Sequence, residues 1–447
     1  MLNGSVSNST AGVIMFSRLK FPVVLLALVT GLGGFPGESG MSSVTYAQSG
    51  TKDAKDKGKP KSPRGKDTPA IPGVNEYSSK NFALRTDLPP DEARELLTRL
   101  ETMLVLVSRY FGKPNTQIIE MNVVKQQTNW PPGSIDADAI QSIESGGGIT
   151  LSVTSFQRNG SGQKQVVGAK SIVWAVADRG TPQHEAVHAY CHQTFGRTGP
   201  TWYSEGMAEL GQYWKEKEDG VNIHDGVLQY LKSEDPKELT EIVAAGQRTG
   251  DSWQNYSWRW ALCHLLAANP NYAPRFKPLG LALLNDQQTS FEAVYGPMAK
   301  EITFEYNFFL KHIDQGLRAD LCSWDWKAKF QRLKGTGSAQ AKIEAMRGWQ
   351  PARVTVKSGD KLSFTATGEW ASSKAGKKVT ADGDEEGKGK LVGILFDDYV
   401  LSEPFELGAN CEWEATGDGN LYLRCRDDWK SIADNSGAVT VKIKLAE

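Results

Sequence analysis

The segment TPQHEAVHAY, residues 181–190, contains the pattern His-Glu-x-x-His, and TWYSEGMAEL, residues 201–210, follows it after a short turn. Only six histidines occur among 447 residues, so two of them at this spacing around a glutamate are an informative match. Residues four apart lie on one face of a helix, so His184 and His188 would project together, as a zinc ion requires. Two histidines can also share a helix face without metal, so a third ligand must decide.

The flanking residues favour a helix that returns toward the two histidines. Thr181 is a residue type preferred at helix starts, and Pro182 suits the first helical position. Gly196, Gly199 and Pro200 then allow the chain to reverse into a second helix, which could carry a carboxylate back to the metal. That carboxylate would belong to Glu205, while Glu209 lies one turn further on the same face.

The pair HEAVH and WYSEGMAE resembles the gluzincin metallopeptidases, which include thermolysin and the zinc aminopeptidases. The resemblance implies that His184, His188 and Glu205 bind zinc and that Glu185 is the general base. It also implies that Glu209 hydrogen-bonds a ligand histidine and fixes its tautomer.

The chain is most similar to the peptidase MA-like group of bacterial proteins, through NYSWRWALCHLL, ANPNYAPRF and SFEAVYG after the zinc motif. This similarity covers residues 82–315 and is tightest over 171–310. Gluzincins use a Tyr or His to stabilise the oxyanion, and Tyr256 is the candidate here, with Tyr203 behind it. A Tyr beside a Trp can equally be a core anchor. No Gly-x-Met-Glu-Asn type segment is found, which favours an endopeptidase over an aminopeptidase.

The N-terminus is typical of an export signal. Arg18 and Lys20 precede an apolar run from Phe21 to Phe35, which is short for a membrane span and contains glycines. Ala47 ends a small-residue cleavage motif, so residues 1–47 are expected to be a signal peptide; the alternative is an uncleaved N-terminal anchor. Export predicts a secreted, periplasmic or cell-envelope protein without a stable membrane span after signal removal.

The remaining chain divides by composition. Residues 48–75 are rich in Lys, Gly, Pro and Asp without apolar periodicity, and they predict a disordered basic linker. Residues 76–333 are expected to form the zincin-like domain, 334–346 a second linker, and 347–447 a lectin-like β-sandwich. The predicted fold class is therefore an α+β multidomain protein, in which the zincin-like domain has a mostly helical C-terminal lobe.

Hydrophobic periodicity places the elements of the first domain. A helix is predicted over 91–111, followed by strands over 116–124, 148–156 and 170–178. The later part predicts helices over 205–214, 226–232, 258–268, 275–284 and 301–315. After residue 350, short alternating runs separated by Gly and Asp predict the β-sandwich. Cys411 and Cys425 flank two strand-like segments there and are the expected disulfide pair.

The segment CRDDWKSIADNSGAVTVKI, residues 425–443, carries oxygen ligands of the kind that calcium prefers, in Asp427, Asp434 and Asn435. The same composition also forms solvated turns with Asx caps, without metal.

The order of these residues, and GDKLSFTATGEWAS at 359–372, resembles the bacterial calcium-dependent galactophilic lectins. The resemblance covers residues 347–447 and implies a calcium site at Ser373, Asp427, Ser431, Asp434 and Asn435. Those lectins carry a sugar-contacting His and Gln after a Gly-Asp pair, but here EEGKGK follows Asp384. Glycan binding by this domain is therefore less well supported than calcium binding.

Together these patterns predict an exported zinc metallopeptidase, expected to be an endopeptidase that hydrolyses peptide or protein substrates with zinc-activated water. The C-terminal domain would target it to a glycan or surface, with calcium as a second metal. The alternative is a catalytically inactive zincin-fold protein that serves in secreted binding or adhesion. A formal net charge of −1 gives no support for nucleic-acid binding.

Overall fold

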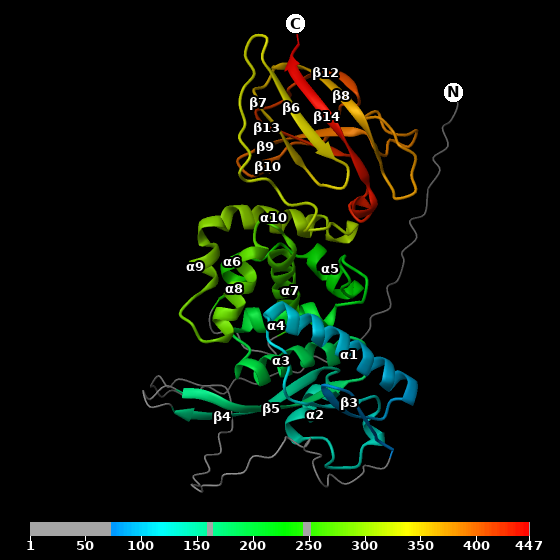
Figure 1. Ribbon diagram of the computed structural model, residues 1–447, viewed down its shortest axis with the longest axis vertical. Coiled ribbons are helices and arrows are strands. Elements are labelled where there is room, and N and C mark those ends of the chain that lie inside the picture. The colour runs from blue at the N-terminus through cyan, green and yellow to red at the C-terminus, as the bar shows by residue number, and fades with distance from the viewer. Residues whose placement is uncertain (1–72, 159–163, 245–251, 447) are drawn as a thin grey trace, which may run out of the picture. The chain divides into compact units, whose positions relative to one another are not determined.

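The computed structural model describes residues 73–158, 164–244 and 252–446, and Figure 1 gives their arrangement. An N-terminal mixed sheet is followed by a run of helices and then by two antiparallel sheets. The predicted α+β class is confirmed. The expected signal peptide and all but the last residues of the expected basic linker lie outside the described residues.

The N-terminal sheet has the strand order β1-β2-β3-β5-β4. Its members are β1 (Asn75–Ser78), β2 (Phe82–Thr86), β3 (Ile119–Val124), β4 (Gly148–Arg158) and β5 (Lys164–Val176). Strands β2, β3 and β5 run parallel, whereas β4 pairs antiparallel with β5 at one edge. Helix α3 (Thr181–Phe195) packs on β5 and β4, so the edge strand lies beside the predicted zinc helix (Figure 1).

Helix α1 (Pro90–Phe111) packs against α3, and both of its ends match the start and stop signals predicted from the sequence. Pro90 occupies its first turn, and Gly112 ends it in a left-handed conformation with φ of 73°. The short helix α2 (Ala137–Glu144) begins at Asp136, whose side chain accepts a hydrogen bond from the Asp138 N–H. Buried apolar side chains of α1 then contribute to the main core: Leu96, Leu97, Leu100, Met103 and Leu104.

The helical part begins with α4, which crosses α3 and packs against α7. Its elements are α4 (Thr201–Gln212), α5 (Asp225–Ser233), α6 (Leu239–Ile242), α7 (Trp253–Ala268), α8 (Ala273–Leu284), α9 (Phe291–Tyr295) and α10 (Ala299–Lys311). A Cβ at Gly206 would lie 2.3 Å from the Cys263 sulfur and 2.9 Å from the Arg259 carbonyl oxygen. Only glycine therefore allows α4 and α7 to approach this closely.

Two helix starts differ from the predictions for local reasons. Helix α7 begins at Trp253 rather than Trp258, because the Ser252 side chain accepts a hydrogen bond from the Asn255 N–H at 3.2 Å. Helix α4 begins at Thr201, directly after Pro200, and so includes the residues before Glu205. Both corrections lengthen helices that carry candidate site residues.

The C-terminal part consists of two antiparallel sheets that share one apolar core. The first contains β7 (Gln350–Val356), β9 (Leu391–Asp397), β10 (Val400–Leu401), β11 (Phe405–Glu406) and β13 (Gly419–Cys425). The second contains β6 (Ser338–Glu344), β8 (Lys361–Ala371), β12 (Asn410–Glu414) and β14 (Ser436–Leu445). Their inner faces supply alternating buried residues, as the sequence pattern predicted for a sandwich.

Two predictions about this part are wrong. Residues 334–346 are not simply a linker, because β6 lies within them and pairs along β14 from Ser338 to Glu344. Cys411 and Cys425 are both free thiols: Cys425 is buried on β13, and Cys411 is partly exposed on β12, the edge strand of the other sheet. Flanking two neighbouring strands along the chain did not bring the two sulfurs together. Among the described residues, no helix is long and apolar enough to span a membrane.

Candidate metal centre

Helix α3 owes its start to a residue that the sequence analysis did not select. The Asp178 carboxylate accepts hydrogen bonds from the Thr181 N–H at 2.6 Å and the Gly180 N–H at 2.9 Å. Thr181 is thus the first helical residue rather than the cap. The Gln183 side chain then donates to the Gly211 carbonyl at 2.6 Å, which ties the start of α3 to the end of α4.

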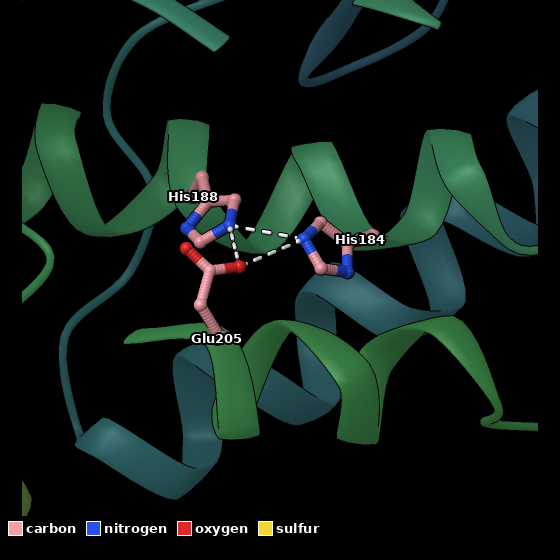
Figure 2. A group of neighbouring side chains, drawn as sticks. All are labelled: His184, His188 and Glu205. Atoms are coloured by element: carbon pink, nitrogen blue, oxygen red, sulfur yellow. Dashed lines mark hydrogen bonds and ion pairs between the residues drawn. The ribbon is translucent and has the colours of Figure 1, made fainter. Parts of the chain in front are cut away.

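The two helices bring three candidate ligands together (Figure 2). The Nε2 atoms of His184 and His188 lie 3.1 Å apart. The Glu205 Oε2 atom lies 3.3 Å from the first and 3.4 Å from the second. All three side chains are largely buried, and this is the one group of three or more His, Cys, Asp or Glu side chains with metal-ligand geometry in the described part of the chain. The group could therefore hold a metal ion.

The spacing of these atoms fits a tetrahedral ion. Bonds of about 2.0–2.1 Å to a tetrahedral zinc separate its ligand atoms by about 3.3–3.4 Å. The three measured separations of 3.1, 3.3 and 3.4 Å approximate one face of such a tetrahedron. The Glu205 Oε2 atom is also buried and makes no hydrogen bond, although the two Nε2 atoms lie 3.3 and 3.4 Å from it. A cation between the three atoms would satisfy this oxygen more fully than these long contacts do.

The charges around the group favour an ion pair in the metal-free protein. Burial disfavours the charged form of His184, but the Glu205 and Glu209 carboxylates outweigh it and raise the pKa of His184 well above its usual value. Burial likewise opposes the charged form of Glu205, yet His188 and His184 hold its pKa below the ordinary range. Metal binding would therefore displace a proton from the imidazoles.

Each histidine also contacts a second group through its other ring nitrogen. The Nδ1 atom of His184 lies 3.2 Å from the Glu209 Oε1 atom. The Nδ1 atom of His188 lies 3.3 Å from the Ser204 hydroxyl. Such partners orient the ring and set which nitrogen faces the metal. Ser204 was not among the predicted site residues, although it directly precedes the predicted ligand Glu205 in the sequence.

Glu185 is 6% exposed and is held by strand β4. The Thr150 hydroxyl donates a hydrogen bond to the Glu185 Oε2 atom at 2.6 Å and lies 3.1 Å from the Glu185 carbonyl oxygen. The carboxylate is thus fixed by β4, on the helix that carries both histidines. Thr150 has no local sequence signal that would pair it with a residue 35 positions away.

Of the two tyrosine candidates, only Tyr256 lies at the metal centre. Its ring stacks on that of His184, with centroids 5.9 Å apart and planes inclined by 16°. Tyr203 is a core residue with 1% exposure, and it packs against Phe276. His264 is also packed, between the rings of Trp260 and Phe309.

The predicted calcium residues form a looser group. The Asp427 Oδ2 atom and the Asn435 Oδ1 atom are both buried without hydrogen-bond partners, which fits a cation site. Asp434, in contrast, is exposed, and Ser373 and Ser431 are only partly buried. The two serine carbonyls each accept a hydrogen bond within their own turn, Ser373 from the Gly376 N–H and Ser431 from the Asp434 N–H.

Comparison with known proteins gives matches among solved structures only. Neither protein-family models nor curated protein sequences match the chain. Among solved structures, the EclA N-terminal domain, described as a PllA-like lectin, is 16% identical, with a TM-score of 0.20. The match covers 24% of this chain and 96% of that domain.

Structures of the IMPa metallopeptidase also match. IMPa from Pseudomonas aeruginosa in complex with an O-glycopeptide is 14% identical, with a TM-score of 0.17, over 50% of this chain and 23% of that one. IMPa in complex with T-antigen gives the same identity and TM-score, over 54% and 29%. This chain thus spans less than a third of IMPa, and at these scores the likenesses carry no argument about function.

Proposed function

We propose that the chain is an exported zinc-dependent peptidase, acting as an endopeptidase, with a zincin-like catalytic domain over residues 76–333. The observation that carries the proposal is the triangle formed by His184 Nε2, His188 Nε2 and Glu205 Oε2, with sides of 3.1–3.4 Å. Two nitrogens and one carboxylate oxygen from the protein are the donor set of catalytic rather than structural zinc sites.

The residues around the triangle suit the hydrolysis of a peptide bond. A zinc ion held there would act as a Lewis acid, polarising the scissile carbonyl and lowering the pKa of a water. Glu185 would take the proton from the attacking water and return it to the leaving amine. Tyr256, stacked on His184, would donate a hydrogen bond from its hydroxyl to the developing oxyanion.

The substrate is proposed to be a peptide or protein outside the cytoplasm, since residues 1–47 have the pattern of an export signal. The C-terminal sheets would serve as a targeting module that binds a glycan or another surface group. Calcium at Asp427 and Asn435 would support that module, because two buried oxygens there have no hydrogen-bond partner.

The catalytic proposal is tested with zinc-loaded full-length protein and a mixed peptide library read by mass spectrometry. We expect cleavage by the wild-type protein and a loss of about 10²- to 10⁴-fold in kcat for Glu185→Gln, since this variant removes the general base. Glu185→Gln should still hold one zinc per chain, because the residue is not a ligand. Glu120→Gln, at a partly exposed site on β3, is the matched control and should cleave normally.

The competing function is a metal-holding protein that binds without turnover. It would be supported if wild-type protein bound zinc but Glu185→Gln left any residual proteolysis unchanged. A glycan array with the full-length chain tests the targeting module separately. Binding that disappears with chelator supports it, and no binding to any glycan contradicts the glycan part of the proposal.

A further inference from the structure

Strand β4 presents an unusual face to the helix that carries the candidate ligands. Gly148, Thr150 and Ser152 alternate along the strand, and each meets α3 or its neighbours. A Cβ at Gly148 would lie 2.8 Å from the Glu185 Cγ atom, so the strand approaches the helix closely at this residue. The Ser152 hydroxyl pairs at 2.9 Å with Ser171 on β5. Only one side chain on this face donates to Glu185.

That side chain is Thr150, which contacts both the carboxylate and the backbone of Glu185. Its single hydroxyl proton is directed to the Oε2 atom at 2.6 Å, because that oxygen is closer and more negative than the carbonyl oxygen at 3.1 Å. We propose that Thr150 is a positioning residue that holds the Glu185 carboxylate in the orientation needed for proton transfer. The role of Glu185 in that statement rests on the proposed peptidase function.

The hydrogen bond from Thr150 would preorganise the Glu185 carboxylate for catalysis. A glutamate side chain has three rotatable bonds, and Glu185 would otherwise sample several orientations beside the metal. A hydrogen bond to one oxygen fixes the carboxylate before substrate binds and leaves the other oxygen available to accept a proton. The threonine is itself held in a β-strand, where β-branched side chains have restricted χ1 angles. The strand and the helix thus set the base together.

The contact itself is tested without catalysis, by a double-mutant cycle in the metal-free full-length protein. Thr150→Val keeps the shape of the side chain and removes the donor, and Glu185→Ala removes the acceptor. If the pair is coupled as inferred, the unfolding equilibrium constants of the single and double variants deviate from additivity by about tenfold. Additive effects within a factor of two would overturn the inference, whatever the protein is found to catalyse.

The positioning role is tested in the zinc-loaded protein. We expect Thr150→Val to lower kcat by about 10- to 100-fold, with KM and zinc affinity within about threefold of wild type. Thr150→Ser should restore kcat to within about threefold, because serine returns the donor. Ser152→Ala is the matched control, since it removes a hydroxyl from the same strand face without touching Glu185, and its kcat should be unchanged.

Three results would overturn the positioning role. The first is a Thr150→Val variant with wild-type kcat, and the second is a Thr150→Ser variant as slow as Thr150→Val. The third is an equal loss in Ser152→Ala, which would assign the effect to strand packing. If the wild-type protein cleaves no peptide, the proposed function fails, and the double-mutant cycle still decides whether Thr150 holds Glu185.

Discussion

The helix pair α3–α4 and the loop from Asp427 to Asn435 hold two candidate metal sites that are built differently. In the helix pair, three ligand atoms converge to within 3.4 Å of one another. The second ring nitrogen of each histidine, Nδ1, already contacts another side chain. In the loop, two oxygens are buried and unpaired while Asp434 points to solvent.

The difference follows from what positions each side chain. A spacing of four residues on one helix fixes two ligands through backbone geometry alone, and the packing of the second helix adds the third. A loop has no such regular geometry, and calcium tolerates a flexible arrangement of oxygen ligands. The comparison therefore predicts that the helical site depends on helix packing, whereas the loop site depends on ionic conditions.

The largest effect is expected at Gly206, where packing should decide the helical site. Gly206→Ala would place a Cβ against the Cys263 sulfur and the backbone of α7, so it should destabilise the protein by about 3 kcal/mol and weaken zinc binding by displacing Glu205. Gly226→Ala on α5 meets no atom within 4 Å and is the control. Chemical denaturation measures both, and equal stability of the two variants would refute the packing argument.

A smaller effect is expected from the partner of His184. Glu209→Gln should weaken zinc affinity by about 10- to 100-fold, because the carboxylate that orients the imidazole is lost while all three ligands remain. Competition with a chromogenic chelator gives the affinity. Glu216→Gln, an exposed residue just beyond α4, should leave it unchanged. Wild-type affinity in Glu209→Gln would show that the helices alone orient the ring.

The loop site should respond to calcium rather than to packing. At calcium ten times above its dissociation constant, binding should stabilise the wild-type protein by about 1.4 kcal/mol. Asp427→Asn should lose this gain, whereas Asp428→Asn, whose side chain is exposed, should keep it. Thermal unfolding with calcium and with chelator compares them. An identical gain in Asp427→Asn would remove the loop from consideration as a calcium site.

The smallest expected effect is on the pH dependence of folding stability. It is measured in metal-free protein, so that loss of metal at low pH does not contribute. Burial lowers the pKa of His264 to about 4 from 6.5, so the unfolded chain takes up a proton that the folded protein excludes. Stability from this residue is lost as the pH falls from 6.5 toward the folded pKa of about 4, and the loss over the first pH unit below 6.5 is about 1 kcal/mol. His264→Phe should reduce that slope in metal-free protein. An unchanged slope would assign the acid sensitivity to other groups.

The sequence predicted the helical site better than the loop site for the same physical reason. His184 and His188 are related by helix periodicity, and Glu205 followed from resemblance to a motif whose two helices pack in a fixed way. Thr150 and Ser204 illustrate two limits. Ser204 was adjacent to a predicted ligand and could have been found, whereas Thr150 reaches Glu185 only through the pairing of β4 with β5, which no local pattern encodes.

The errors in the fold also come from long-range pairing. Strand β6 has weak hydrophobic alternation, because two of its three buried residues are alanines and its outward residues are polar, and its strand structure depends on pairing with β14. The expected pairing of Cys411 with Cys425 is wrong, since both thiols are free, with Cys425 buried on β13 and Cys411 partly exposed on the edge strand β12. Where hydrophobic periodicity is strong, the bounds of an element are predicted well, and both ends of α1 lie within one residue of the prediction.

The most direct test of the central claim is the zinc content of purified full-length protein, measured by elemental mass spectrometry for wild type and Glu205→Ala. The account predicts about one zinc per wild-type chain and a large loss of zinc in the variant, since a three-ligand site would be reduced to two histidines. Absence of zinc from the wild-type protein after zinc loading would contradict the account. Full retention in Glu205→Ala would show that the zinc is bound elsewhere.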